Sequence, residues 1–217
     1  MRHDTHVPTS ARPAILAAAR HLFAERGFAG TSMREIAEAA GVSKAAIYHH
    51  FRDKRRLYRE LLDEGINTLT AAMRRLPDEG PARAQLARIL LLHLEFARAH
   101  ADLLRMMVHE QWQAGERRRP VSSAIARHHE EELTIFAAVL ERGIARGEFK
   151  PVEPALSAQA LCVVIDIISA GFVMAAPPVS AAEVAQNVMD VLLNGLAATP
   201  VAPAEVAELF TAKEKTA

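Results

Sequence analysis

The sequence predicts an all-α protein with a small N-terminal helical domain, residues 1–52, and a larger helical domain, residues 53–217. Apolar residues recur at helical spacing along most of the chain, and no stretch shows the alternation typical of a β-strand. Glycine and proline interrupt this pattern where helices are expected to end. With 217 residues, half of them hydrophobic, the chain is long enough for one large core or two small ones.

Two short predicted helices stand close together in the N-terminal domain. Ser32, followed three residues later by Glu35, is a capping box, in which each side chain satisfies a free backbone N–H group at a helix start. Gly41 suits the turn after this helix, because glycine adopts left-handed backbone conformations without steric cost. Ser43 caps a second helix that runs to about His50. This is the helix-turn-helix arrangement, whose second helix enters the DNA major groove.

The next predicted helix begins with cations. Asp53 is its expected cap, and Lys54, Arg55 and Arg56 fill its first turn. Positive charge at a helix N-terminus opposes the helix dipole. A phosphate group bound from outside would offset that cost. The pattern therefore predicts contact with a nucleic-acid backbone.

The run GVSKAAIYHHFRDK, preceded by REIAEAA and ILAAARHLFAERGF, resembles the DNA-binding domain of the tetracycline-repressor (TetR) family of transcriptional regulators. The resemblance covers residues from about Pro8 to Leu61. It implies an N-terminal three-helix domain that contacts DNA through Thr31, Ser32, Arg34, Ser43, Lys44, Ala45, Ala46, Tyr48, His49 and Lys54. Ala45 and Ala46 offer only methyl contacts, so base recognition is expected to depend more on Lys44, His49 and Arg34.

Charge is unevenly distributed along the chain, although the overall net charge is zero. Residues 1–60 hold 11 Lys or Arg against 6 Asp or Glu, and the remainder is acidic. A basic N-terminal part on an acidic remainder suits a DNA-binding domain joined to a domain with another role. The single cysteine, Cys162, excludes an intrachain disulfide, and the N-terminus lacks the apolar region of a signal peptide. A cytoplasmic location is expected.

Helices are also predicted in the rest of the chain. The first expected helix, residues 11–27, braces the helix pair with Ile15, Leu22 and Phe23. The larger domain is expected to contain helices over residues 53–76, 82–99, 100–113, 120–146, 154–176 and 180–196. The tail from Thr199 is rich in Ala, Pro and charged residues and is expected to fray.

Three of these helices direct polar groups to the same faces as their apolar residues. His93 shares the apolar face of residues 82–99, and His129 that of residues 120–146. On residues 100–113, Gln111 and Trp112 follow the apolar face of Met107. A mostly apolar cavity with a few convergent polar groups is typical of a small-molecule site. The predicted ligand-binding residues are His93, Phe96, Met107, Gln111, Trp112, His129, Phe136 and Phe172. Each of them could instead be an ordinary core residue.

A metal site is the other use for the histidines. His128 and His129 precede three consecutive glutamates, so His128 could share a helix face with Glu131 or Glu132. Acidic and histidine residues on an outer helix face are more often simply solvated, and no cysteine is expected among them. No metal ion and no cofactor are therefore predicted.

The last two helices carry more apolar surface than one core can cover. Val163 and Val173 are expected on the side of residues 154–176 opposite Phe172, and Gly171 and Ala185 allow close approach. The resemblance likewise implies a homodimer, formed through residues 154–176 and 180–196. Asp166 interrupts the most apolar stretch, which favours a buried helix over a membrane span and leaves Asp166 as a hydrogen-bond partner across the dimer or a ligand contact.

Together these features predict a sequence-specific DNA-binding transcriptional regulator, a repressor released from a pseudo-palindromic operator by a small, largely apolar effector. An all-helical enzyme using His93 or His129 as general base is the alternative, but no nucleophile, metal set or phosphate loop accompanies either residue. A non-specific architectural DNA binder would be more basic. The sequence leaves open the effector, the operator and whether the chain represses or activates.

Overall fold

The computed structural model describes residues 11–114, 123–175 and 179–194, and all regular structure within them is α-helical. The helices are α1 (Ala11–Arg26), α2 (Met33–Ala39), α3 (Lys44–His50), α4 (Lys54–Arg74), α5 (Ala82–Ala99), α6 (Ala101–Ala114), α7 (Ser123–Ala145), α8 (Pro154–Ala175) and α9 (Ala181–Asn194). The prediction of an all-α fold is confirmed. Gln111 and Trp112 lie on α6, but their side chains fall outside the described residues.

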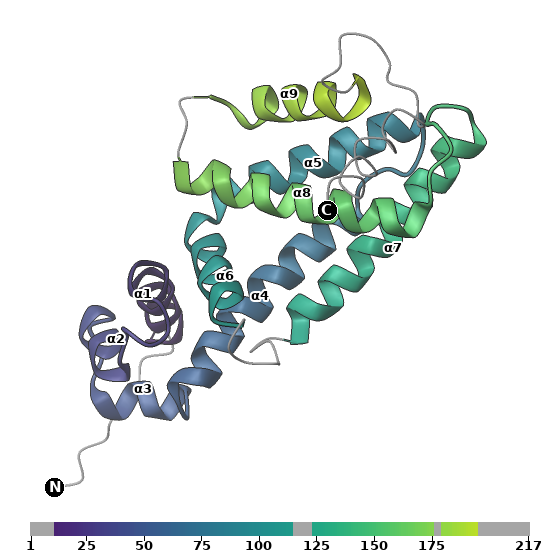
Figure 1. The fold of residues 1–217 in the computed structure, drawn as a ribbon. Coiled ribbons are helices and arrows are strands. Elements are labelled where there is room, and N and C mark those ends of the chain that lie inside the picture. Colours follow the sequence, from purple (N-terminus) through teal and green to yellow (C-terminus); the bar gives the residue numbers. More distant parts are fainter. Residues whose placement is uncertain (1–10, 115–122, 176–178, 195–217) are drawn as a thin grey trace, which may run out of the picture.

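The helices gather at two ends of the molecule. Helices α1, α2 and α3 surround the beginning of α4 at one end, and α5, α7, α8 and α9 form the other (Figure 1). Helix α4 runs from one group to the other, and α6 packs against both α1 and α8. We call the first group the head and the second the body. A shift of α4 or α6 would therefore move residues in both the head and the body.

The head core is almost entirely apolar. The ring of Tyr58 on α4 meets Phe23 of α1 edge-on at 4.9 Å between centroids. The Tyr58 hydroxyl donates a 3.1 Å hydrogen bond to the backbone oxygen of Met106 on α6. Phe96 and Leu103, from the end of α5 and from α6, belong to the same core. The core of the head thus extends well beyond residue 52.

The body core is formed by the end of α4 and by α5, α7, α8 and α9. Its centre holds Phe136, Leu90 and Cys162, all essentially inaccessible to solvent. Polar groups are buried beside them, notably His93, His128 and Glu132, which are 4%, 7% and 1% exposed. The body therefore buries several ionisable groups together, whereas the buried polar side chains of the head are the hydroxyl residues Tyr58 and Thr31.

Helix α8 has one buried and one exposed apolar face. Its inward residues include Cys162 and Phe172, whereas the apolar residues that remain exposed are Leu156, Val163, Ile167 and Met174. By length and hydropathy alone α8 could cross a membrane, but it packs against α5 and α7 and carries Asp166 at its middle. It is a core helix with one uncovered face.

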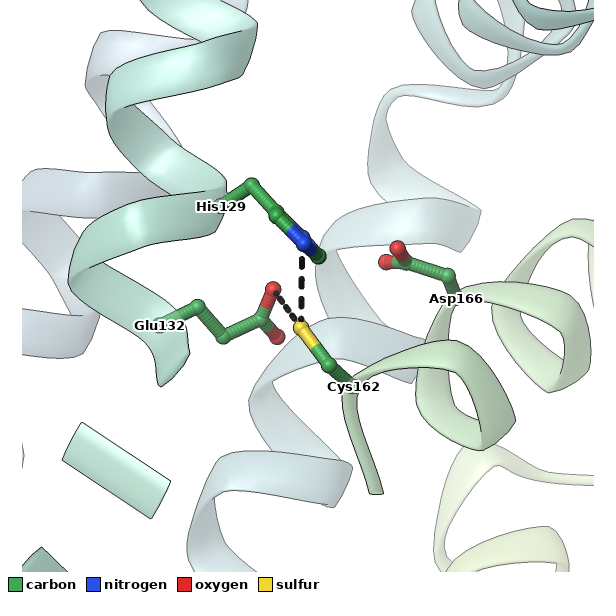
Figure 2. A group of neighbouring side chains, drawn as sticks. All are labelled: His129, Glu132, Cys162 and Asp166. Atoms are coloured by element: carbon green, nitrogen blue, oxygen red, sulfur yellow. Dashed lines mark hydrogen bonds between the residues drawn. The ribbon is translucent and has the colours of Figure 1, made fainter. Parts of the chain in front are cut away.

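Some details of this face differ from the prediction. Val163 and Gly171 lie on the exposed side as expected, but Val173 and Ala185 are buried in the subunit. Asp166 is half-buried and faces α7 of its own chain (Figure 2), so it lies away from the exposed stripe. Each residue advances about 100° around a helix, so an error of one position moves a side chain to another face.

Candidate functional site

The helix pair in the head is held by local hydrogen bonds. The Ser32 hydroxyl accepts from the Glu35 N–H at 3.2 Å, and the Glu35 carboxylate accepts from the Ser32 N–H at 2.8 Å. The Ser32 hydroxyl also donates to the Glu35 carboxylate at 2.6 Å, and this bond, together with that from the Ser32 N–H, lowers the pKa of Glu35. Gly41 adopts a φ of 66°, and Ser43 caps α3 through the Ala46 N–H at 3.1 Å. The predicted capping box, turn and second cap are confirmed.

Helix α3 presents most of its predicted DNA-binding residues to solvent. Ile47 is fully buried and anchors the helix, which turns Lys44, Ala45 and His49 outward. Tyr48 is 47% exposed, which is a high fraction for a large aromatic side chain. Ser43, Ser32 and Arg34 are also exposed, and Ala46 is half-buried.

A groove of about 580 Å³ lies between the short helices α2 and α3. The beginning of α2 contributes Ser32 and Arg34, and α3 contributes Lys44 and Tyr48. The two helices thus present one continuous polar surface. Such a surface is of the size and character that enters a DNA groove.

Thr31 and Lys54 are placed differently from the prediction. The Thr31 side chain is 3% exposed, and its hydroxyl lies within 3.0 Å of the Gly27 oxygen. The Lys54 ammonium donates to the backbone oxygens of Phe28 and Thr31, at 2.7 and 2.6 Å. It also lies 4.4 Å from the centre of the Phe28 ring. Both residues therefore fasten the loop between α1 and α2, so neither is a simple phosphate ligand.

The exposed cations lie next to this anchor. Arg55 and Arg56 of α4, with Arg12 of α1 and Arg52, line an open groove of about 720 Å³. Asp53 caps α4 by accepting from the Arg56 N–H at 2.8 Å. The sequence pattern identified the first turn of α4 but not Arg12, about forty residues earlier, which reaches the same groove and pairs there with Glu60. Asp53, Asp63 and Glu64 also line this groove.

Comparison with known families bears directly on this surface. Residues 15–61 match the family model described as bacterial regulatory proteins of the tetR family. Residues 79–196 match the tetracyclin repressor-like C-terminal domain.

The chain belongs to the TetR family.

Relatives of this TetR-family chain include characterised repressors. It is 30% identical over 150 residues to the repressor KstR2 of Rhodococcus jostii, which covers 68% of this chain and 72% of that protein. It is 23% identical to KstR2 of Mycolicibacterium smegmatis over 87% of this chain and 92% of the relative. The solved structure of Mycobacterium tuberculosis KstR2 has a TM-score of 0.72 at 25% identity, covering 88% and 97% of the two chains. This regulator is accordingly a ligand-responsive, DNA-binding transcriptional repressor.

The predicted ligand-binding residues of this TetR-family protein are not gathered in one place. Phe136 and Phe172 belong to the body core, whereas Phe96 belongs to the head core and Met107 packs against it. His93 is buried among the body residues, as predicted. His129 is mostly exposed, and it is His128 that points into the body. The predicted inward face of α7 was therefore one residue off at His129, whereas Phe136 is buried as predicted.

The buried polar groups of the body meet at Glu132. His93 Nε2 lies 3.1 Å from one carboxylate oxygen, and the Cys162 thiol donates to the other at 2.9 Å. His128 Nε2 lies 4.0 Å from that second oxygen. Figure 2 shows the Cys162 sulfur between Glu132 and His129, with Asp166 opposite. Glu132 is thus not on a solvated face, and a cysteine does join the group, contrary to the prediction.

The charges of this cluster depend on one another. Burial alone would lower the pKa of His93, but the adjoining Glu132 carboxylate raises it above its usual value. Burial alone would raise the pKa of Glu132, but His93 and Cys162 lower it. Burial lowers the pKa of His128 and raises that of the Cys162 thiol. Burial, reinforced by Glu132, raises the pKa of Asp166 to about 6.

Proposed function

We propose that this repressor reads a pseudo-palindromic operator through α3, as a homodimer formed by α8 and α9. The observation that carries the proposal is the exposed face of α3, fixed by the burial of Ile47 beneath it. Lys44 and His49 can donate to base edges, and the Ala45 methyl suits contact with thymine. Arg34 and Tyr48 extend this surface toward the DNA backbone.

Lys54 and Thr31 support this surface by holding the loop that precedes α2. The arginines at the start of α4 are better placed to neutralise phosphates, since they are exposed. We therefore propose that Thr31 and Lys54 act as positioning residues for the DNA-binding surface. In the same way the DNA-binding region is proposed as residues 1–52, with its core completed by α4 and α6.

The dimer is proposed to cover the exposed stripe of α8. Leu156, Val163, Ile167 and Met174 follow one another at intervals of four or seven residues and lie on one side of the helix. Ala160 and Gly171 are exposed on the same side, and a Cβ at Gly171 would meet open space. Val191 and Leu192 of α9 add further exposed apolar surface. An apolar strip with small residues at its centre suits close packing of two identical helices.

The effector is proposed to be small and largely apolar, and to bind in the body near Phe136, Phe172 and His93. The solved structures of Bacillus subtilis FadR with stearoyl-CoA, 22% identical with a TM-score of 0.66, and of AibR with isovaleryl coenzyme A and operator DNA, 18% identical with a TM-score of 0.68, share the fold. Acyl groups are apolar, which agrees with this choice. By linkage, effector and operator weaken each other's binding by the same factor.

We propose no catalytic role for His93 or His129. His93 is 4% exposed and faces a carboxylate, so a general base there could not reach a substrate in this conformation. A regulator that binds operator DNA works in the bacterial cytoplasm, where we place this chain.

The operator is tested by selecting fragments from a library of bacterial genomic DNA on the purified protein at near-physiological salt. Enrichment of one pseudo-palindromic sequence is expected. Retention without sequence preference, from protein shown to be folded and dimeric, would contradict the proposal.

The dimer is tested with Ile167→Arg, measured by sedimentation equilibrium. This change buries a charge in the proposed interface and is expected to give a folded monomer. Glu141→Arg, at an exposed position of α7 outside the proposed interface, is the control and should remain dimeric. An unchanged dimer in Ile167→Arg would place the interface elsewhere.

A further inference from the structure

Three buried side chains bring potential metal ligands together in the body. His93 comes from α5, and His128 and Glu132 come from successive turns of α7. Their ligand atoms all lie within 4.8 Å of one another, and each residue is less than 10% exposed. Burial of three ionisable groups in an otherwise apolar core is costly unless something satisfies them together.

The orientation of His93 leaves its Nε2 without a proton in the neutral ring. Its Nδ1 lies 2.8 Å from the backbone oxygen of Ile89, and a carbonyl oxygen can only accept. Nδ1 must therefore carry the hydrogen, so Nε2 offers a lone pair. Nε2 lies 3.1 Å from Glu132 Oε1, so the two atoms form an ion pair when the ring is protonated and two facing lone pairs when it is neutral.

His128 is oriented in the same way by a residue of α4. The Thr70 hydroxyl donates its only proton to the backbone oxygen of Ile66 at 2.9 Å. It must therefore accept from His128 Nδ1, which lies 2.8 Å away. Nε2 of His128 then also carries a lone pair in the neutral ring, and it is 4.0 Å from Glu132 Oε2. Histidines that ligate metals are held through their second nitrogen in this manner.

Two imidazole lone pairs and one carboxylate thus converge on a single place. We propose that His93 Nε2, His128 Nε2 and Glu132 bind a divalent transition-metal ion of the Zn²⁺ type. Bonds of about 2.0–2.2 Å in a tetrahedron hold ligand atoms about 3.3–3.6 Å apart, within the range spanned by 3.1 and 4.0 Å in this cluster. Nitrogen donors exclude Mg²⁺ and Ca²⁺, which prefer oxygen.

Neighbouring groups support this site from behind. The Cys162 thiol donates to Glu132 Oε2 at 2.9 Å and so orients the carboxylate as Thr70 orients His128. A cavity of about 290 Å³ between α4 and α7 is lined in part by Thr70 and His128, so open space adjoins the outer side of this cluster. A metal ion here would join α5 to α7 directly and α4 through Thr70.

A second group competes for Glu132 and supplies the control. His129, Cys162 and Asp166 also bring ligand atoms within 4.8 Å of Glu132 (Figure 2). His129 is exposed, and the Cys162 thiol is already engaged with Glu132, whereas His93 and His128 are both buried. We therefore assign the ion to the His93 and His128 side of Glu132.

The test is isothermal titration of Zn²⁺ and Co²⁺ into the full-length, chelator-treated protein. One ion per chain is expected to bind in the unaltered protein, and His128→Asn and Glu132→Gln are expected to lose that binding. Thr70→Val, which removes only the partner of His128 Nδ1, should weaken it by about 10–100-fold. His129→Asn is the matched control and should bind as the unaltered protein does.

The Co²⁺ absorption spectrum of the unaltered protein gives a readout that does not depend on the folding of any variant. Bands of tetrahedral Co²⁺ without a thiolate charge-transfer band are expected. No stoichiometric binding of either ion would reduce the cluster to a buried ion pair. A strong thiolate band, or loss of binding in His129→Asn but not in His128→Asn, would place the ion in the second group. Either result overturns the proposal, and neither depends on the operator or the effector.

Discussion

The head and the body differ in the kind of polar side chain that they bury. In the head, Tyr58 is the largest fully buried side chain, and its one polar atom is satisfied by the Met106 backbone. In the body, Glu132 is equally inaccessible but carries a charge, and it is surrounded by two histidines and a thiol. A core of hydrocarbon has one best packing. A core with ionisable groups depends on their protonation and on what is bound among them.

This difference matches the division of labour in the repressor. The head must hold α3 in one orientation, which a dry core with local caps ensures. The body must change when a ligand binds, and a two-state response needs an element that a ligand can bias. Helices α4 and α6 contribute residues to the head core and also pack against the body, so they are the physical route between the two.

The largest loss of stability that distinguishes the two cores is expected at Glu132. Glu132→Ala, in the presence of a chelator, should lower the free energy of unfolding by about 3–5 kcal/mol, because His93 loses its buried counter-ion. Urea denaturation measures the change. Glu131→Ala, which removes the neighbouring surface pair with Arg74, should cost much less. Similar losses in both would show that Glu132 is no more demanding than a surface carboxylate.

A smaller loss of stability is expected from removing the Tyr58 hydroxyl in the head core. Tyr58→Phe removes the hydroxyl and leaves the Met106 oxygen without this donor, which should cost about 1–3 kcal/mol in urea denaturation. The ring contact with Phe23 is kept, so DNA affinity should hardly change. A loss as large as that of Glu132→Ala would contradict the distinction between the two cores.

Lys54 separates a positioning role from a phosphate contact. Lys54→Met should cost about 1–2 kcal/mol of stability, because the backbone oxygens of Phe28 and Thr31 lose their ammonium donor. DNA affinity should fall, but the dependence of log K on log salt should keep its slope. A phosphate ligand would instead reduce that slope by about one unit. Fluorescence anisotropy at several salt concentrations gives both quantities.

Lys54 also shows how far the sequence alone could be interpreted. The capping box at Ser32, the turn at Gly41 and the cap at Asp53 depend on residues within four positions of one another, and each was predicted. The partners of Lys54 lie more than twenty residues away, and Cys162 lies thirty residues from Glu132. Such pairs arise only from packing, which no local pattern records.

The assignment of His129, in place of His128, to the inward face of α7 was wrong for a related reason. His128 and His129 are adjacent and chemically identical, so the apolar pattern alone had to decide which of them points inward. Glu132 lies one turn beyond His128, but a glutamate within a run of three gives no sign of being buried. Burial of such a residue depends on His93 and Cys162, which other helices supply.

The smallest expected change in stability, and the sharpest test of the head, is Tyr48→Ala. Tyr48 is exposed on α3 and makes no described core contact, so the free energy of unfolding should stay within about 0.5 kcal/mol. DNA affinity should fall by about tenfold, the size of one lost contact of about 1.4 kcal/mol. Glu25→Ala, exposed on the far side of α1's buried stripe, should leave both quantities unchanged. If Tyr48→Ala instead destabilised the protein while binding DNA normally, α3 would be a structural helix, and the reading surface would have to lie elsewhere on the head.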